Sequence, residues 1–96
     1  MQNLTGTWNC NDGGTYYITQ IENTIYLSGS ARGWYNVGYG VINIADQSIA
    51  LQWADTPNSA GFGNSGLCYL DASQNGVITK KAGNPTFGIG NFTKIS

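Results

Sequence analysis

Three stretches of this sequence combine aromatic side chains with amides or a guanidinium group, a combination suited to recognising polar ligands. Aromatic faces stack on C–H surfaces, while amides and guanidinium groups form hydrogen bonds with hydroxyls. The stretch 29–36, GSARGWYN, is the richest of the three, and 55–65 and 82–88 are the others. They predict a site for a small polar molecule or a carbohydrate, with the candidate ligand-binding residues Arg32, Trp34, Asn36, Trp53, Asp55, Phe62, Asn64 and Phe87.

Catalytic chemistry is difficult to assemble from the same inventory. The chain has no histidine, which excludes Ser–His and Cys–His pairs and histidine-containing metal sites. Asp12 and Asp55 could form an acid–base pair if their loops converge, and the alternative is that each caps its own turn. We expect a non-enzymatic protein with no catalytic residue, metal or cofactor, because the five acidic residues are scattered through turns: Asp12, Glu22, Asp46, Asp55 and Asp71.

Charge and hydropathy narrow the choice of partners. The net charge is −1 and the chain has only four basic residues, too few to neutralise a row of phosphates. No apolar run has the length of a membrane span, and no basic start precedes an apolar stretch. We therefore expect no nucleic acid or membrane partner and a soluble protein, cytoplasmic by default, with secretion left open.

The pattern of apolar residues predicts the elements that position these groups. Short segments alternate apolar and polar residues between turn residues, at the spacing of an antiparallel meander, and none has helical length. The sequence predicts one all-β domain over residues 1–96, an eight-stranded antiparallel up-and-down barrel, with strands at 4–10, 15–20, 24–28, 35–43, 48–54, 66–71, 77–81 and 89–95.

The connections between these strands differ at the two ends of the predicted barrel. Tight turns join the even strands to the odd strands that follow them, whereas 11–14, 29–34, 55–65 and 82–88 all fall at the other end. This second end should be the mouth, ringed by loops. The interior is either filled by side chains or open to one small ligand, and Trp34 and Phe62 could instead close over it as a lid.

Alternation also predicts which side chains face inward. Trp8 should plug the closed end, with Cys10 on the same face of its strand, and the faces of Ile49 to Trp53 and of Cys68 to Leu70 should also be internal. Cys10 and Cys68 are three strands apart around the ring. At about 4.8 Å per strand, their Cα atoms should exceed the disulfide limit of about 7 Å. Both should be thiols, as in a reducing compartment.

Several motifs resemble known barrels. The segment LTGTW, followed by a glycine-containing turn and a Thr-aromatic strand, resembles the first hairpin of avidins, which share a G-x-W with lipocalins in the calycin group. NFTKIS resembles the avidin last strand, and LQWAD lies where avidins carry a wall tryptophan. The pattern of GTW, NDGGTYYI, WADTP and SGL is similar to small bacterial barrel domains of unassigned function. The resemblance implies an avidin/lipocalin-like barrel and no particular activity.

Biotin binding is not carried over with the avidin resemblance. Alignment of the GTW and FTK motifs places Cys10, Gly14 and Gly90 at the positions of the avidin ureido ligands. None of the three supplies the corresponding contact, and each missing bond to a buried group costs about 1–3 kcal/mol. We expect a lectin-like binding protein that does not bind biotin.

Two further expectations concern partners. Strands two, four and six carry large residues on both faces, such as Tyr16 and Tyr17, which favours a homo-oligomer, a dimer or larger. A second interpretation is an interaction or inhibitor module of small calycin-like type that presents 55–65 as an exposed loop. A third is a cofactor-free barrel isomerase, which would need a buried, desolvated carboxylate.

Overall fold

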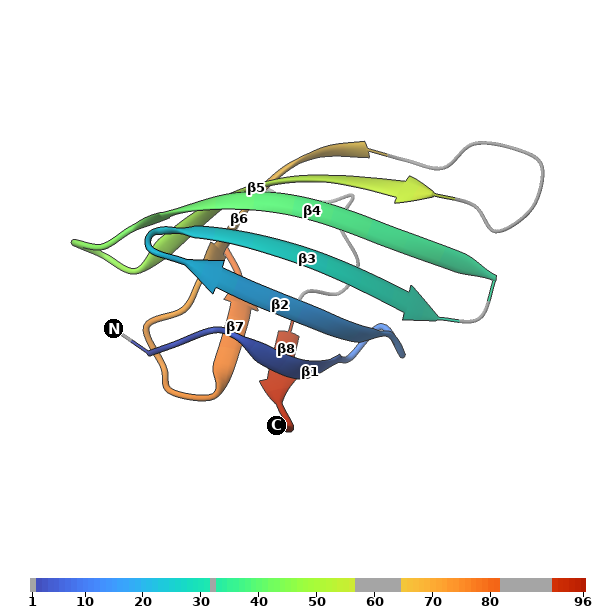
Figure 1. Ribbon diagram of the computed structural model, residues 1–96, viewed down its shortest axis with the longest axis horizontal. Coiled ribbons are helices and arrows are strands. Elements are labelled where there is room, and N and C mark those ends of the chain that lie inside the picture. Colours follow the sequence, from blue (N-terminus) through green and yellow to red (C-terminus); the bar gives the residue numbers. More distant parts are fainter. Residues whose placement is uncertain (1, 32, 57–64, 82–90) are drawn as a thin grey trace.

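The chain folds as a closed antiparallel β-barrel in which each strand pairs with its neighbours in sequence (Figure 1). The computed structural model describes residues 2–31, 33–56, 65–81 and 91–96, and only the backbone of Ala31 and Trp34. The predicted fold class and meander order are confirmed. The strands are β1 (Gly6–Cys10), β2 (Thr15–Ile21), β3 (Thr24–Ala31), β4 (Trp34–Asn43), β5 (Ser48–Thr56), β6 (Ser65–Asp71), β7 (Val77–Lys80) and β8 (Asn91–Lys94).

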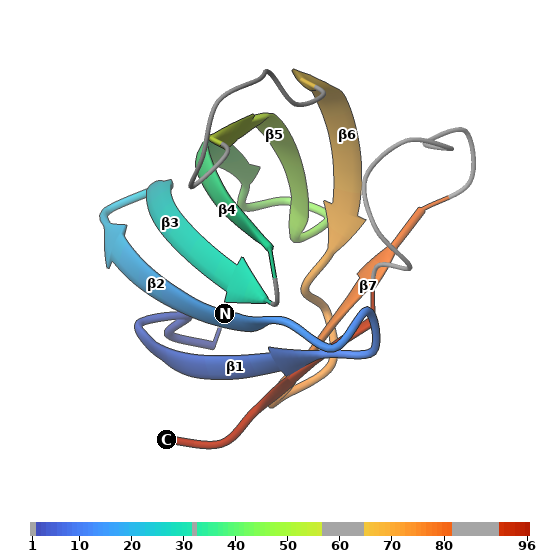
Figure 2. The same ribbon diagram turned by 90° about the vertical axis from the view of Figure 1, so that its right-hand side faces the viewer.

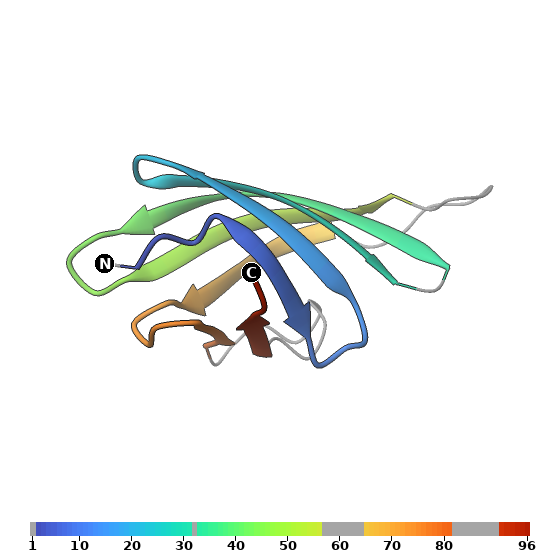
Figure 3. The same ribbon diagram turned by 60° about the horizontal axis from the view of Figure 1, so that its bottom comes forward.

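The first and last strands close the barrel. β1 pairs with β8, with Trp8 opposite Lys94 and Cys10 opposite Phe92. Figure 3 shows β8 in red beside β1 in dark blue, on the side of the barrel away from the long strands β2 to β5. The backbone N–H of Ile95 also donates to the carbonyl of Thr7 at 2.8 Å, which extends this seam beyond β8. The predicted pairing of the chain's two terminal segments is confirmed.

One end of the barrel is closed by tight turns. Asn43, Asp46 and Asp71 each accept a backbone N–H from two residues further along, the Asx-turn geometry expected of these residues. The side chain of Gln2 lies across this end, with Nε2 donating to the carbonyl of Ala72 at 2.9 Å and Oε1 accepting from the N–H of Gly76 at 2.8 Å. The N-terminal segment is thus held against the β6–β7 turn.

At the opposite end, one connection is much shorter than expected. The stretch 29–34 was expected as a loop, and this prediction is wrong because β3 and β4 continue in register as far as Ala31 and Trp34. The connection between them is reduced to residues 32 and 33, with Gly33 at a φ of 86°, a value that favours glycine. The 55–65 stretch is also shorter than expected, because β5 continues to Thr56.

The closed half of the barrel is filled by side chains. Trp8 is fully buried, and its Nε1 donates to the carbonyl of Leu4 at 2.9 Å, so the indole points toward the tight turns as predicted for a plug. The inward faces predicted for β1, β5 and β6 are confirmed by the burial of Cys10, Trp53, Cys68 and their neighbours. Small residues on β4 make room for this packing. A Cβ at Gly40 would lie 2.9 Å from a methyl carbon of Ile49.

The two cysteines are thiols, as predicted. Cys10 and Cys68 are both buried, and no disulfide joins them. Burial raises the pKa of the Cys68 thiol to about 11, only weakly opposed by the charge of Lys80. The Cys68 sulfur is therefore protonated at neutral pH and behaves as a small apolar group.

Candidate ligand site at the open end

A row of inward-facing residues crosses four strands just below the open end. The register places Tyr16 of β2 opposite Gly29 of β3, Gly29 opposite Asn36 of β4, and Asn36 opposite Asp55 of β5. We call these four residues the mouth row. Figure 2, which looks at the barrel from this end, shows β2 to β5 following one another around the wall. The closed half contains apolar side chains, whereas the mouth row carries a phenol, an amide and a carboxylate.

Asn36 and Asp55 form a cross-strand pair in this row. The Nδ2 of Asn36 donates to Oδ1 of Asp55 at 2.9 Å. A carboxylate only accepts hydrogen bonds, so the amide must turn its nitrogen toward Asp55. Its Oδ1 is then directed elsewhere and has no hydrogen-bond partner among the described residues, although Asn36 is only 3% exposed. A buried carbonyl oxygen in this position favours a donor from outside the described residues.

The structure places Asp55 in a strand. The sequence placed it in the connection after the fifth strand, whereas it lies within β5 and pairs across to β4. Asp12 does cap its turn, because its Oδ1 accepts the backbone N–H of Gly14 at 2.7 Å. The other Asp12 oxygen accepts the Tyr16 hydroxyl at 3.0 Å, so this carboxylate also fixes the phenol of the mouth row.

The Tyr16 ring is held on three sides. A Cβ on Gly29 would overlap the ring, which shows that the phenol lies directly over the glycine. Phe92 of β8 contacts it edge to face at a centroid distance of 5.0 Å. Burial, then the charge and hydrogen bond of Asp12, and then smaller contributions from Cys10 and Asp55 raise the pKa of Tyr16 well above its usual value. Tyr16 is therefore a neutral hydrogen-bond donor.

The two carboxylates of the mouth lie at the same end of the barrel. Asp12 accepts the hydroxyl of Tyr16, and Asp55 lies in the same row as Tyr16, although the two acids are far apart in sequence. Both are partly exposed and both accept hydrogen bonds. Within the described ranges, no three Cys, Asp or Glu side chains form a group able to hold a metal ion. With the amide oxygen of Asn36, the carboxylates of Asp12 and Asp55 make this end of the barrel rich in hydrogen-bond acceptors.

The structure brings together three of the residues predicted from sequence. Asn36 and Asp55 pair in the mouth row, and Trp53 lies one inward position below Asp55 on β5, buried against the Cα side of Gly66. Trp34 belongs to β4, but its side chain is not among those described. The remaining candidates lie outside the described residues: Arg32, Phe62, Asn64 and Phe87.

Tyr16 and Asp12, which contribute polar groups to this site, were not among the candidates. Tyr16 was read only as a large strand residue, and Asp12 as an acid with either a turn-capping or a catalytic role. The signal that could have identified them is their spacing in NDGGTYY, where an acid four residues before an aromatic hydroxyl spans a tight hairpin turn. Cys10 of β1 is buried on the inner surface opposite Phe92 of β8, which contacts Tyr16.

The fold and this row define the molecule as a small closed meander barrel with a polar rim above an apolar interior. Comparisons of the chain with known protein families, with curated proteins and with solved structures found no match. No helix long and apolar enough to cross a membrane occurs within residues 2–31, 33–56, 65–81 and 91–96.

Proposed function

We propose that this barrel is a non-enzymatic binding protein that takes a small, uncharged, hydroxyl-rich ligand, a saccharide unit or a similar polar molecule, at its open end. The observation that carries the proposal is the buried Oδ1 of Asn36, which has no hydrogen-bond partner among the described residues. Leaving a buried acceptor without a donor costs about 1–3 kcal/mol, and a ligand hydroxyl at this position would remove that cost.

The chemistry of the surrounding groups supports a ligand with many donors. Asn36 Oδ1 and the carboxylates of Asp12 and Asp55 are all acceptors. Sugar hydroxyls supply donors at several positions, whereas an anion would be repelled by the two carboxylates. The Tyr16 ring and the Trp53 indole, which are 1% and 5% exposed, form an apolar floor beneath these polar groups.

The filled interior supports a shallow position for this ligand. Leu51, Ile49 and Leu70 are buried in the closed half, so the ligand would rest on the mouth row and not descend into the barrel. This position agrees with the sequence-based hypothesis that Arg32, Trp34, Phe62, Asn64 and Phe87 contribute from the rim.

The test is calorimetric titration with monosaccharides, using N-acetylglucosamine, mannose, galactose and glucose as probes. The parent chain should bind at least one of them, and Asn36→Ala should weaken that binding by about tenfold or more, since an interaction of about 1.4 kcal/mol or more is lost. Asn9→Ala is the matched control, because Asn9 is an exposed residue of β1. Biotin should not bind.

Three outcomes would contradict the proposal. If none of the four sugars binds, the ligand class is wrong. If a sugar binds Asn36→Ala as tightly as the parent chain, the site is wrong. If Arg32→Ala and Trp34→Ala both bind as tightly as the parent chain, then the rim residues assigned from the sequence do not contribute.

A further inference from the structure

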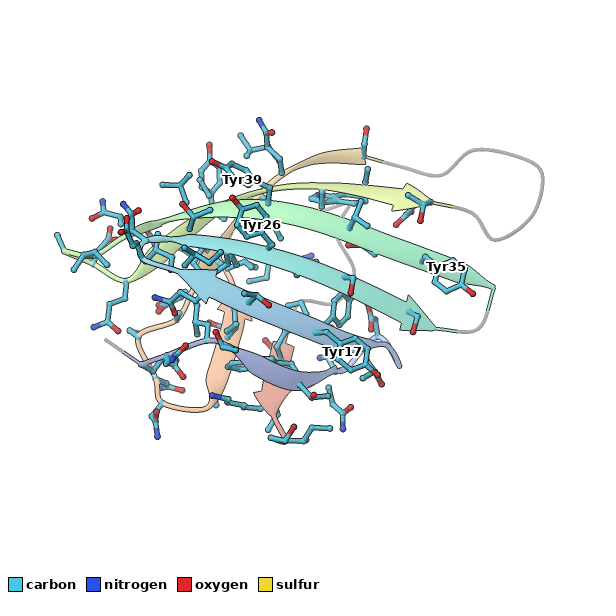
Figure 4. All side chains as sticks on the ribbon, in the orientation of Figure 1. Tyr17, Tyr26, Tyr35 and Tyr39 are labelled. Carbon is cyan, nitrogen blue, oxygen red and sulfur yellow. The ribbon has the colours of Figure 1, made fainter. Side chains whose placement is uncertain are left out.

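The outer surface of β2 to β5 has a composition unlike the rest of the molecule. Its outward positions carry tyrosine, valine, isoleucine, threonine, serine, alanine, asparagine and glutamine, and none of these described positions holds Asp, Glu, Lys or Arg. Four tyrosines stand on this surface, and Figure 4 shows them along β2, β3 and β4, pointing away from the barrel. We call this surface the tyrosine face, after its members Tyr17, Tyr26, Tyr35 and Tyr39, which are 45–55% exposed.

Two shallow hollows lie on the tyrosine face. The first, of about 340 Å³, is bounded by Tyr17 and Tyr35, with Ser28 and Ser30 between them. The second, of about 400 Å³, is lined by Tyr39 and by Gln52 of β5. Val37 belongs to both hollows, so together they form one track that crosses the strands.

The register explains how the first hollow forms. Tyr17 lies opposite Ser28 on β3, and Tyr35 lies opposite Ser30 two residues further along. The two aromatic rings therefore flank a floor of small hydroxyl side chains. Tyr17 and Tyr35 stand two strand spacings apart, at about 4.8 Å per spacing, and are also offset from each other by two residues along the strands.

The second hollow has an ordered aromatic wall. Tyr39 contacts Tyr26 edge to face, with ring centroids 5.5 Å apart and an interplanar angle of 62°. This contact restrains the Tyr39 ring before anything binds, which lowers the entropy lost on binding. Gln52, across from Tyr39 on β5, adds an amide that both donates and accepts hydrogen bonds.

From these features we propose that the tyrosine face is a second binding site, for an uncharged oligosaccharide chain that lies along the track. The absence of charge on the outward positions of β2 to β5 selects an uncharged partner, and the alternation of rings with hydroxyls and an amide fits pyranose faces and their hydroxyls. A second copy of the chain fits less well. Two convex barrel walls meet along a narrow strip, whereas stable interfaces bury about 800 Å² on each partner.

This site differs from the one at the mouth in the direction of its side chains and in ligand size, although residues 36 and 53 also border the two hollows. It uses outward side chains of the strands whose inward side chains form the mouth row. It takes a chain of several sugar units, whereas the mouth takes one small ligand. Either site can therefore fail in experiment without the other.

The experiment is calorimetric titration of the parent chain with cellohexaose, xylohexaose, mannohexaose and chitohexaose. At least one should bind, and Tyr35→Ala should weaken that binding by about tenfold, the factor expected for one stacked ring. Tyr35→Phe should keep most of the affinity because it keeps the ring. Tyr69→Ala is the matched control, since Tyr69 is an outward, exposed tyrosine of β6 that lines neither hollow. Asn9→Ala, at an exposed residue of β1 that lines neither hollow, should leave this binding unchanged.

Three kinds of result would overturn the proposal. Either no hexasaccharide binds, or one binds and Tyr35→Ala has no more effect than Tyr69→Ala. Sedimentation equilibrium tests for the third result, in which a second copy of the chain occupies the face. If the parent chain forms a dimer that both Tyr35→Ala and Tyr17→Ala dissociate, the face is occupied by a second copy and the saccharide assignment is wrong.

Discussion

Gly29 is the residue on which the position of the Tyr16 phenol depends. The ring covers the glycine, receives an edge contact from Phe92 and donates its hydroxyl to Asp12. Any side chain at position 29 would occupy the volume of the ring. The absence of a side chain at position 29 therefore leaves the space that the Tyr16 ring occupies in the mouth row.

Substitution of Gly29 tests this dependence. Gly29→Ala should destabilise the protein by about 1–3 kcal/mol, the usual cost of forcing extra atoms into a packed site. Gly66→Ala is the matched control, since a Cβ there would lie 3.5 Å from the Trp53 ring, an ordinary contact. Urea unfolding followed by tryptophan fluorescence measures both. Equal stability of the two variants would mean that the Tyr16 ring moves aside at no cost.

The buried thiol of Cys68 makes stability fall at alkaline pH. Its pKa is raised from 9.0 to about 11 in the folded protein, so between these values the unfolded chain releases the proton and the folded chain keeps it. Stability that is fully present below pH 9 is therefore lost as pH rises toward 11, by about 2 kcal/mol near pH 10.5 for this group. The raised pKa of Tyr16 acts in the same direction at higher pH.

The measurement is the free energy of unfolding in urea at pH 8 and at pH 10.5. Cys68→Ala should be less stable at pH 8 but should lose less stability on going to pH 10.5. A variant that loses as much as the parent chain would show that Cys68 does not carry the effect.

At the scale of elements, the N-terminal segment acts as a clasp on the closed end. Gln2 Nε2 also donates to the carbonyl of Gln74 at 2.6 Å, and the backbone N–H of Leu4 donates to Oε1 of Gln20 at 2.9 Å. These bonds join residues before β1 to the β6–β7 turn and to the end of β2. In the described structure, β6 and β7 pair only at Leu70–Lys80 and Asp71–Thr79. The bonds of the N-terminal segment add contacts on this side of the barrel, where strand pairing is short.

Removal of the clasp should loosen this side of the barrel. Gln2→Ala should cost about 1–2 kcal/mol of stability and should speed amide hydrogen exchange over residues 72–78. Gln74→Ala is the control, because Gln74 contributes only its backbone carbonyl to the clasp. Unchanged exchange over 72–78 in Gln2→Ala would contradict this role.

The sequence was sufficient to predict the strands but not their extent near the mouth. Alternation with a buried apolar face, as from Ile49 to Trp53, identifies a strand because only one register hides these residues. Gly29, Ser30 and Gly33 look like loop residues, so the extension of β3 and β4 was missed. Gly29 lies in a strand for a reason of tertiary structure, the ring of Tyr16, which local propensity does not contain.

The candidate site was predictable where residue type decided its role and not where pairing did. Asn36 and Trp53 were identified from their chemistry and their position in the order of strands. The pairing of Asn36 with Asp55 depends on the register of β4 against β5, and the contact of Tyr16 with Asp12 depends on the shape of a tight turn. Neither register nor turn shape is fixed by composition.

At the scale of the molecule, the barrel divides its surfaces by role. The closed half supplies the packed core, the open end carries the acceptors of the mouth row, and the long outer wall of β2 to β5 carries the tyrosine face. Closure by β1 and β8 leaves no free sheet edge at this seam, and such an edge would otherwise be a site of aggregation. The expected homo-oligomer stays a prediction, and the sedimentation experiment tests it.

The clasp has a practical consequence for handling the protein. Gln2 is bound at the closed end, and the carbonyl of Ser96 accepts the N–H of Thr7 at the start of β1, so both termini lie away from the mouth. An affinity handle, a fluorescent reporter or a tether to a sensor chip could be attached through a spacer at either terminus. The rim would then face the solution, and immobilised protein should capture the proposed saccharide ligand as readily as protein in solution.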